Sequence, residues 1–148
     1  MATTMTLLLT HWPRMYVVQI GDSRCYVLHQ HELLRVTRDQ TLAQRLVDEG
    51  AISEAQAAGS RFAHVLSSAI GADALEPAST AFTFDPDDVI LLCTDGLTKH
   101  VTDDEIREHL DTLASAEKTA RALVDLALER GGTDNVTVVV GCLLRKPE

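Results

Sequence analysis

The sequence predicts an α+β fold in which mostly antiparallel β-strands pack beneath α-helices. Short apolar and β-branched runs, separated by polar or glycine-containing turns, fill the first third of the chain, as is typical of antiparallel strands. A polar segment with helical spacing follows, and the second half has the order strand, helix, helix, strand. Because antiparallel strands can be joined by such short turns and parallel strands cannot, this pattern disfavours a doubly wound parallel sheet.

The first third is predicted to form an antiparallel meander. Its apolar runs cover residues 4–9, 15–20, 25–29 and 33–37. Each run has the length of an ordinary strand, and the breaks between the runs suit short turns. We therefore expect these strands to lie side by side in sequence order.

Residues 41–60 are predicted to form a helical flap outside the core. Leu42, Leu46 and Val47 recur at helical spacing, and Gly50 ends that pattern. Ser53 and Gln56 then have the spacing of a capping box, which predicts a second short helix. The length and polarity of the segment favour a flap over a core element.

The second half is predicted to contain a strand that is buried on both faces, two helices and a final strand. The expected elements are a strand at 79–84, a buried strand at 89–93, helices that begin near 102 and 115, and a strand at 135–144. Thr102 and Glu105 have the spacing of a capping box, and Ser115 is the expected cap of the longer helix. Residues 145–148 are expected to form a flexible tail.

The composition indicates one globular domain that spans residues 1–148. Of the 148 residues, 45% are hydrophobic, which is enough for a core. Acidic side chains outnumber basic ones by 22 to 13, and the net charge of −9 argues against nucleic acids and anionic membranes as partners. No apolar run approaches the roughly 18 residues of a membrane span, and no basic region precedes the short apolar run at residues 7–9, so the expected location is the cytoplasm.

The cysteines are predicted to be reduced. Cys25, Cys93 and Cys142 are far apart in the sequence, and each lies within an apolar run. Buried free thiols fit this pattern better than a disulfide framework or a zinc cluster.

Aspartates recur beside the ends of apolar strands. Asp22, Asp95 and Asp134 each stand next to glycine, asparagine or another small polar residue at such a point. Carboxylates on a rigid base suit hard cations such as Mg²⁺ and Mn²⁺, although each aspartate taken singly also fits ordinary turn chemistry. Five further aspartates are assigned to turns: Asp39, Asp73, Asp85, Asp87 and Asp88.

A serine hydrolase fits the sequence poorly. Ser23 and Ser68 lack the glycine pattern of a nucleophile elbow. The six histidines show no paired metal-ligand spacing. They are His11, His29, His31, His64, His100 and His109.

Four motifs together carry a family resemblance. They are VVQIGDSRCYVL, TRDQTLAQRLVDEG, VILLCTDGLTKHV and GGTDNVTVVV, at residues 17–28, 37–50, 89–101 and 131–140. In this order and with similar spacing they resemble the motifs of the PP2C (PPM) family of metal-dependent protein serine/threonine phosphatases. Four motifs in order are far more specific than any one of them.

The resemblance implies a PP2C-like β-sandwich flanked by helices in αββα layers, with a binuclear Mg²⁺ or Mn²⁺ centre at one end. By motif, Asp95 and Asp134 resemble direct metal ligands, and Asp22 resembles a contributor to a weaker third metal position. Gly96 and Asn135 resemble supports of the ligand loops. The implied reaction is attack on phosphoserine or phosphothreonine by a water that bridges two metals, without a covalent enzyme intermediate.

Two departures from the family pattern shape the functional hypotheses. The first residues resemble an internal segment of the family, so the expectation is an N-terminally truncated domain with an incomplete metal centre. Lys99 stands where many relatives carry another aspartate, and it is expected either to pair with nearby carboxylates or to face solvent.

Two hypotheses about function remain open. The first is the C-terminal part of a PP2C-type phosphatase that is active when the front portion is present, on the same or a separate chain, and that acts on a phosphorylated protein in a serine/threonine kinase pathway. The alternative is a catalytically inactive, phosphatase-like regulatory or phosphoprotein-binding module. Under the alternative, a truncated sandwich would leave an apolar sheet face uncovered, which predicts self-association.

Overall fold

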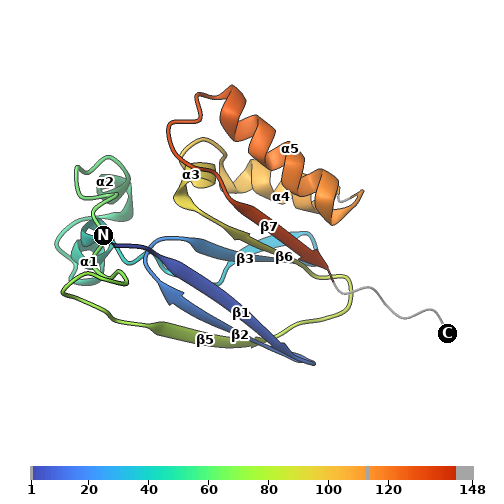
Figure 1. The fold of residues 1–148 in the computed structure, drawn as a ribbon, viewed down its shortest axis with the longest axis horizontal. Coiled ribbons are helices and arrows are strands. Elements are labelled where there is room, and N and C mark those ends of the chain that lie inside the picture. The colour runs from blue at the N-terminus through green and yellow to red at the C-terminus, as the bar shows by residue number, and fades with distance from the viewer. Residues whose placement is uncertain (1, 113, 143–148) are drawn as a thin grey trace.

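The computed structural model describes residues 2–112 and 114–142, which form two stacked antiparallel sheets with helices on one side (Figure 1). The elements are β1 (Met5–His11), β2 (Arg14–Ile20), β3 (Arg24–His29), β4 (Glu32–Arg35), α1 (Leu42–Asp48), α2 (Glu54–Ala58), β5 (Ala78–Thr83), β6 (Val89–Cys93), α3 (Asp95–Thr98), α4 (Asp103–Asp111), α5 (Ala116–Glu129) and β7 (Val138–Cys142). The predicted α+β class is confirmed, and the sheets are antiparallel throughout this part of the chain.

The predicted meander is wrong in one respect, because its strands divide between the two sheets. One sheet has the order β1-β2-β5 and the other has the order β4-β3-β6-β7. The break comes at Gly21, whose φ of 103° is open to glycine and strained for other residues. Cys25 to Leu28 of β3 are all buried, so this strand needs cover on both faces and pairs with the equally buried β6.

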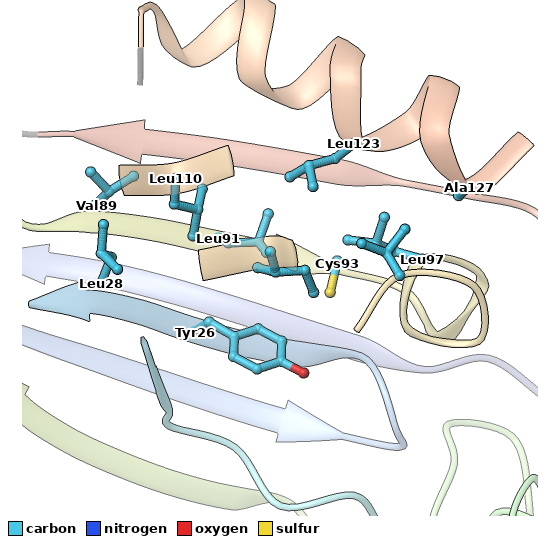
Figure 2. Packing of buried hydrophobic residues seen from close by; sticks show 11 residues of the cluster. Tyr26, Leu28, Val89, Leu91, Cys93, Leu97, Leu110, Leu123 and Ala127 are labelled. Carbon is cyan, nitrogen blue, oxygen red and sulfur yellow. The ribbon is translucent and has the colours of Figure 1, made fainter. Parts of the chain in front are cut away.

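Alternation along β3 and β6 builds two hydrophobic cores. Tyr26 and Leu91 face the helices α4 and α5, in a cluster that includes Leu97 and Leu123 (Figure 2). The opposite face of these two strands contributes to a second cluster, which fills the space between the two sheets. This cluster contains Met15, Val17, Cys25, Val27, Phe84 and Ile90. The strand at 89–93 is therefore buried on both faces, as predicted.

The predicted caps fix where the helices begin. Thr102 and Glu105 form the capping box of α4, and the Ser115 side chain accepts a hydrogen bond from the Lys118 backbone N–H at the start of α5. Ser53 and Gln56 form the capping box of α2. These side chains satisfy backbone donors that have no partner within their helices.

The outer face of the β1-β2-β5 sheet is apolar and exposed. Met5, Leu7 and Leu9 alternate along β1 and are 38%, 51% and 61% exposed. Leu7 lies opposite Val18, and Leu9 lies opposite Tyr16, on the same face. Helices α4 and α5 cover the other sheet, while α1 and α2 lie at one end of the sandwich (Figure 1). Of the implied αββα layers, the described residues therefore form three.

Several smaller predictions are also tested. Cys25 and Cys93 are buried and Cys142 is half-buried, and all three are free thiols, as expected. Burial raises the pKa of the Cys25 thiol to about 12. The last strand begins at Val138, later than the predicted start at 135, and the parts of that prediction at 143–144 and of the tail at 145–148 lie outside the described residues. Within the described part of the chain, no helix is long and apolar enough to cross a membrane.

Candidate metal centre

Asp95 is held rigidly at the end of the buried strand β6. Thr94 has extended backbone angles, and Asp95 is the first residue of the short helix α3. The Thr94 backbone N–H donates to the Thr137 carbonyl at 3.1 Å, which ties this turn to the residues before β7. Leu97 is fully buried in the helix-side core, so both ends of the turn are anchored.

Gly96 and Asn135 bring the second acidic loop against α3. A Cβ on Gly96 would lie 2.3 Å from the Asn135 carbonyl oxygen, so only glycine permits this approach. The Thr94 hydroxyl donates to the same carbonyl at 3.1 Å. The loop that carries Asp134 is thereby docked beside Asp95.

The ammonium group of Lys99 lies between the two predicted ligands. Its Nζ is 2.7 Å from Asp95 Oδ2 and 2.7 Å from Asp134 Oδ2. Of the two expectations for Lys99, ion pairing is confirmed. The hydrogen bond from Lys99 and the backbone N–H of Asn135 lower the pKa of Asp134. Burial lowers the pKa of Lys99, but the hydrogen bonds to Asp134 and Asp95 outweigh it and leave that pKa raised.

Asp22 lies on the connection between the two sheets and faces the same region. The pKa of Asp22 is raised, mainly by burial and secondly by the negative charge of Asp95. Asp22, Asp95 and Lys99 line one cavity of about 560 Å³ at the end of the sandwich. The structure thus gathers all three predicted aspartates at one end, with Asp134 joined to the others through Lys99.

A half-buried arginine network that the sequence analysis missed contributes Arg24, Asp39 and Asp103 to the lining of this cavity. Arg24 binds the Asp39 carboxylate in a bidentate manner, with Nη2 at 2.7 Å from Oδ2 and Nε at 3.0 Å from Oδ1. Arg24 also donates to the Tyr26 hydroxyl, which in turn donates to Asp103 Oδ1 at 2.9 Å. Because of these bonds the pKa of Arg24 is raised despite its burial.

The assignment of Asp39 to a turn is therefore wrong, since it lies in a segment without a turn, between β4 and α1, and pairs with Arg24. The signal for the network was available in β3, where Arg24 and Tyr26 are two residues apart and so lie on one face. The other turn aspartates behave differently. The backbone N–H of Asp88 donates to the Asp85 carbonyl at 3.2 Å, which closes the predicted turn at 85–88.

The predicted flap forms the opposite wall of the cavity. Residues of both α1 and α2 line it, as does the exposed His64 that follows them. The two helices contact each other and bury little, because Ala43 is the single buried residue of α1 and α2. The wall that carries the carboxylates is anchored in a core, whereas the facing wall is only lightly packed.

The chemistry of these side chains suits a hard divalent cation. Carboxylate oxygens are the preferred ligands of Mg²⁺ and Mn²⁺. Asp95 and Asp134 already share one cation, the Lys99 ammonium, which shows that the position between them favours positive charge. Among the described residues, no group of three or more His, Cys, Asp or Glu side chains is arranged to hold a metal ion. These residues therefore fit part of a metal site.

The chain is similar to known protein phosphatases over nearly its whole length. The serine/threonine protein phosphatase PstP of Mycobacterium tuberculosis is 42% identical over 140 residues, which cover 95% of this chain and 27% of that protein. A crystal structure of M. tuberculosis PstP/Ppp superposes with a TM-score of 0.89 at 39% identity, over 96% of this chain and 60% of that one. A structure of the PstP catalytic domain in complex with two manganese ions gives a TM-score of 0.84 at 40% identity, over 97% of this chain and 60% of that one.

A family model described as Stage II sporulation protein E (SpoIIE) matches residues 54–143, more than half of the chain. The chain belongs to the PP2C (PPM) phosphatase family. Its two sheets and flanking helices are those of the PP2C fold. The chain spans 27% of the curated PstP protein and about 60% of the matched PP2C structures, so it shares with them a part of their length.

Proposed function

We propose that this chain provides one side of a binuclear metal centre in a protein phosphatase that hydrolyses phosphoserine and phosphothreonine. The observation that carries the proposal is the convergence of Asp95 and Asp134 on one cation position beside the cavity that also contains Asp22. The similarity to PstP, for which a structure in complex with two manganese ions is known, supports Mg²⁺ or Mn²⁺ as the cofactor.

Each site residue has a distinct role in this proposal. Asp95 and Asp134 bind metal through their carboxylates, and Asp22 contributes to a weaker third position. Gly96 and Asn135 keep the two acidic turns in contact. When bound, the metal pair supplies a water of lowered pKa and neutralises phosphoryl oxygens, so the protein needs no nucleophile of its own.

The proposed substrate is a phosphorylated protein in a serine/threonine kinase pathway. The cavity is lined by Arg24, Arg35 and Lys99, each paired with a carboxylate, so charged groups of both signs border the space that a phosphorylated side chain would enter. The flap at 41–60 lies opposite and would contact the residues that flank the phosphate. The cytoplasm remains the predicted compartment, and the free thiols agree with it.

The proposal is tested by phosphate release from a phosphothreonine peptide in the presence of Mn²⁺, with this chain as part of a phosphatase domain that also supplies the opposing metal ligands. We expect release that requires the metal and falls at least about 100-fold in Asp95→Asn, because one metal ligand loses its charge. Asp125→Asn is the matched control, since it removes the same charge from an exposed position on α5. Activity that is indifferent to Asp95→Asn would contradict the proposed site.

The position of Lys99 favours a second candidate, a phosphatase-like module that binds phosphoproteins without hydrolysing them. Its ammonium group already neutralises the two carboxylates that a metal would use. Fluorescence polarisation with the same labelled phosphopeptide separates the two candidates. Binding without phosphate release, with or without Mn²⁺, favours the module.

We further propose that the outer face of the β1-β2-β5 sheet associates with a second copy of the chain. Its exposed apolar side chains come from neighbouring strands and form one continuous surface that includes Leu7, Leu9 and Tyr16. Such a surface is larger than the isolated apolar side chains that monomers commonly expose.

A further inference from the structure

Lys99 joins two segments that are distant in the sequence. It projects from the end of α3, one turn after Asp95, and its second partner Asp134 is 35 positions further along the chain. The donor lies at 2.7 Å from an oxygen of each carboxylate. The Lys99 side chain is 22% exposed, so this bridge is less screened by water than an ordinary surface ion pair.

The surroundings would be strongly anionic without this bridge. Asp22, Asp95 and Asp134 all approach the same end of the sandwich, and the Asp95 charge already raises the pKa of Asp22. Arg24 does not relieve this repulsion, because its guanidinium is engaged by Asp39 and Tyr26. The nearest positive charge on the two predicted ligands is therefore that of Lys99.

We propose that the Lys99 ammonium is a built-in cation of this site, which holds Asp95 and Asp134 together without a metal and must leave its place before a divalent ion can use both carboxylates. This inference rests on the proposed metal centre. Lys99 is then a positioning residue with two effects. Its ammonium group stabilises the metal-free site, and the same group weakens metal binding.

The proposal has two physical consequences of opposite sign. Removing the ammonium leaves two carboxylates facing one another, which destabilises the metal-free protein through like-charge repulsion. The same removal eliminates a competitor for the carboxylate oxygens, so a divalent ion binds more tightly. A purely structural lysine would produce the first effect without the second.

The experiment compares the wild-type chain with Lys99→Met, which keeps much of the apolar stem and removes the charge. Thermal unfolding followed by circular dichroism in EDTA is expected to show a melting temperature about 2–4 °C lower in the variant. Mn²⁺ binding, followed by the electron paramagnetic resonance signal of the free ion, is expected to be about tenfold tighter in the variant. Added Mn²⁺ should consequently raise the melting temperature of Lys99→Met more than that of the wild type.

Two further variants provide the controls. Lys118→Met removes a positive charge from an exposed position on α5 and should change neither quantity. Lys99→Arg restores the positive charge and should recover the wild-type melting temperature in EDTA together with weak Mn²⁺ binding. If Lys99→Met does not fold in EDTA, Lys99→Gln, which retains hydrogen-bonding capacity, takes its place in both measurements.

Thermal unfolding in EDTA and Mn²⁺ binding together distinguish a failure of this inference from a failure of the proposed function. An unchanged melting temperature of Lys99→Met in EDTA overturns the inference, as does equal or weaker Mn²⁺ binding by that variant. An absence of Mn²⁺ binding in all variants, with the EDTA effect intact, overturns the proposed metal centre and with it the displacement of Lys99.

Discussion

The two sheets share one interface but differ in what covers their other faces. The β4-β3-β6-β7 sheet is enclosed between the helices α4 and α5 and the second sheet, and its central strands are buried on both sides. The β1-β2-β5 sheet contributes its inner face to the common core and leaves Met5, Leu7 and Leu9 exposed. One sheet is covered on both faces, and the other leaves an apolar face exposed.

This difference explains where the acidic residues lie. Asp95 closely follows β6 of the enclosed sheet, and Asp134 lies in the loop that leads into β7 and is docked against the Asp95 turn. Asp22 comes from the crossing between the sheets. Precise placement of a ligand requires a backbone that is held from several directions. The exposed sheet has less of that support, and its outward face carries apolar side chains instead.

The largest expected effect comes from opening a cavity beneath the helices. Leu123 is fully buried against the enclosed sheet (Figure 2). Leu123→Ala should lower the free energy of unfolding by about 2–5 kcal/mol, as measured by urea denaturation. Leu128→Ala on the same helix is the control, because Leu128 is 54% exposed. Equal losses in the two variants would mean that the helical layer does not cover this sheet as described.

A smaller loss is expected at the contact between the two acidic turns. Gly96→Ala places a methyl group against the Asn135 carbonyl, and it should cost about 1–3 kcal/mol through overpacking and weaken Mn²⁺ binding. Urea denaturation and the Mn²⁺ titration measure the two effects. Gly141→Ala in β7 is the matched control, since a Cβ there meets no atom within 4 Å. A neutral Gly96→Ala would contradict the docking of the loop on α3.

The smallest change in stability is expected on the uncovered sheet. Leu7→Ser should alter the free energy of unfolding by no more than about 0.5 kcal/mol, while reducing self-association in light scattering. Val139→Ser also replaces an exposed apolar side chain by serine, but on a strand of the other sheet, and it should leave association unaffected. A wild-type chain that is monomeric at all concentrations would contradict the proposed association.

Local chemistry was predictable from the sequence. The caps at Thr102 and Ser115 were recognisable because a side-chain acceptor and its backbone donor are close in the chain. The buried strand β6 was recognisable from its unbroken apolar run. The turn residues beside Asp95 were recognised for the same reason, whereas β7 begins at Val138, later than the predicted start at 135, so Asp134 lies in the preceding loop. The family motifs assigned both aspartates to one site.

Long-range pairing was harder to predict. Nothing in the local pattern of β2 and β3 shows that Gly21 directs the chain from one sheet into the other, because that depends on which strands need cover on both faces. Helix α3 has four residues, too few for periodicity to reveal. The bridging position of Lys99 depends on the loop before β7, which the sequence places 35 residues away.

The Arg24 network fastens two separate parts of the cavity lining to one strand. Asp39 is bound by Arg24 shortly before the chain enters α1, and Tyr26 connects Arg24 to Asp103 in the first turn of α4. The segment that leads into the flap and the start of the helical layer are thus both attached to β3. A substitution at Arg24 would therefore loosen both attachments at once.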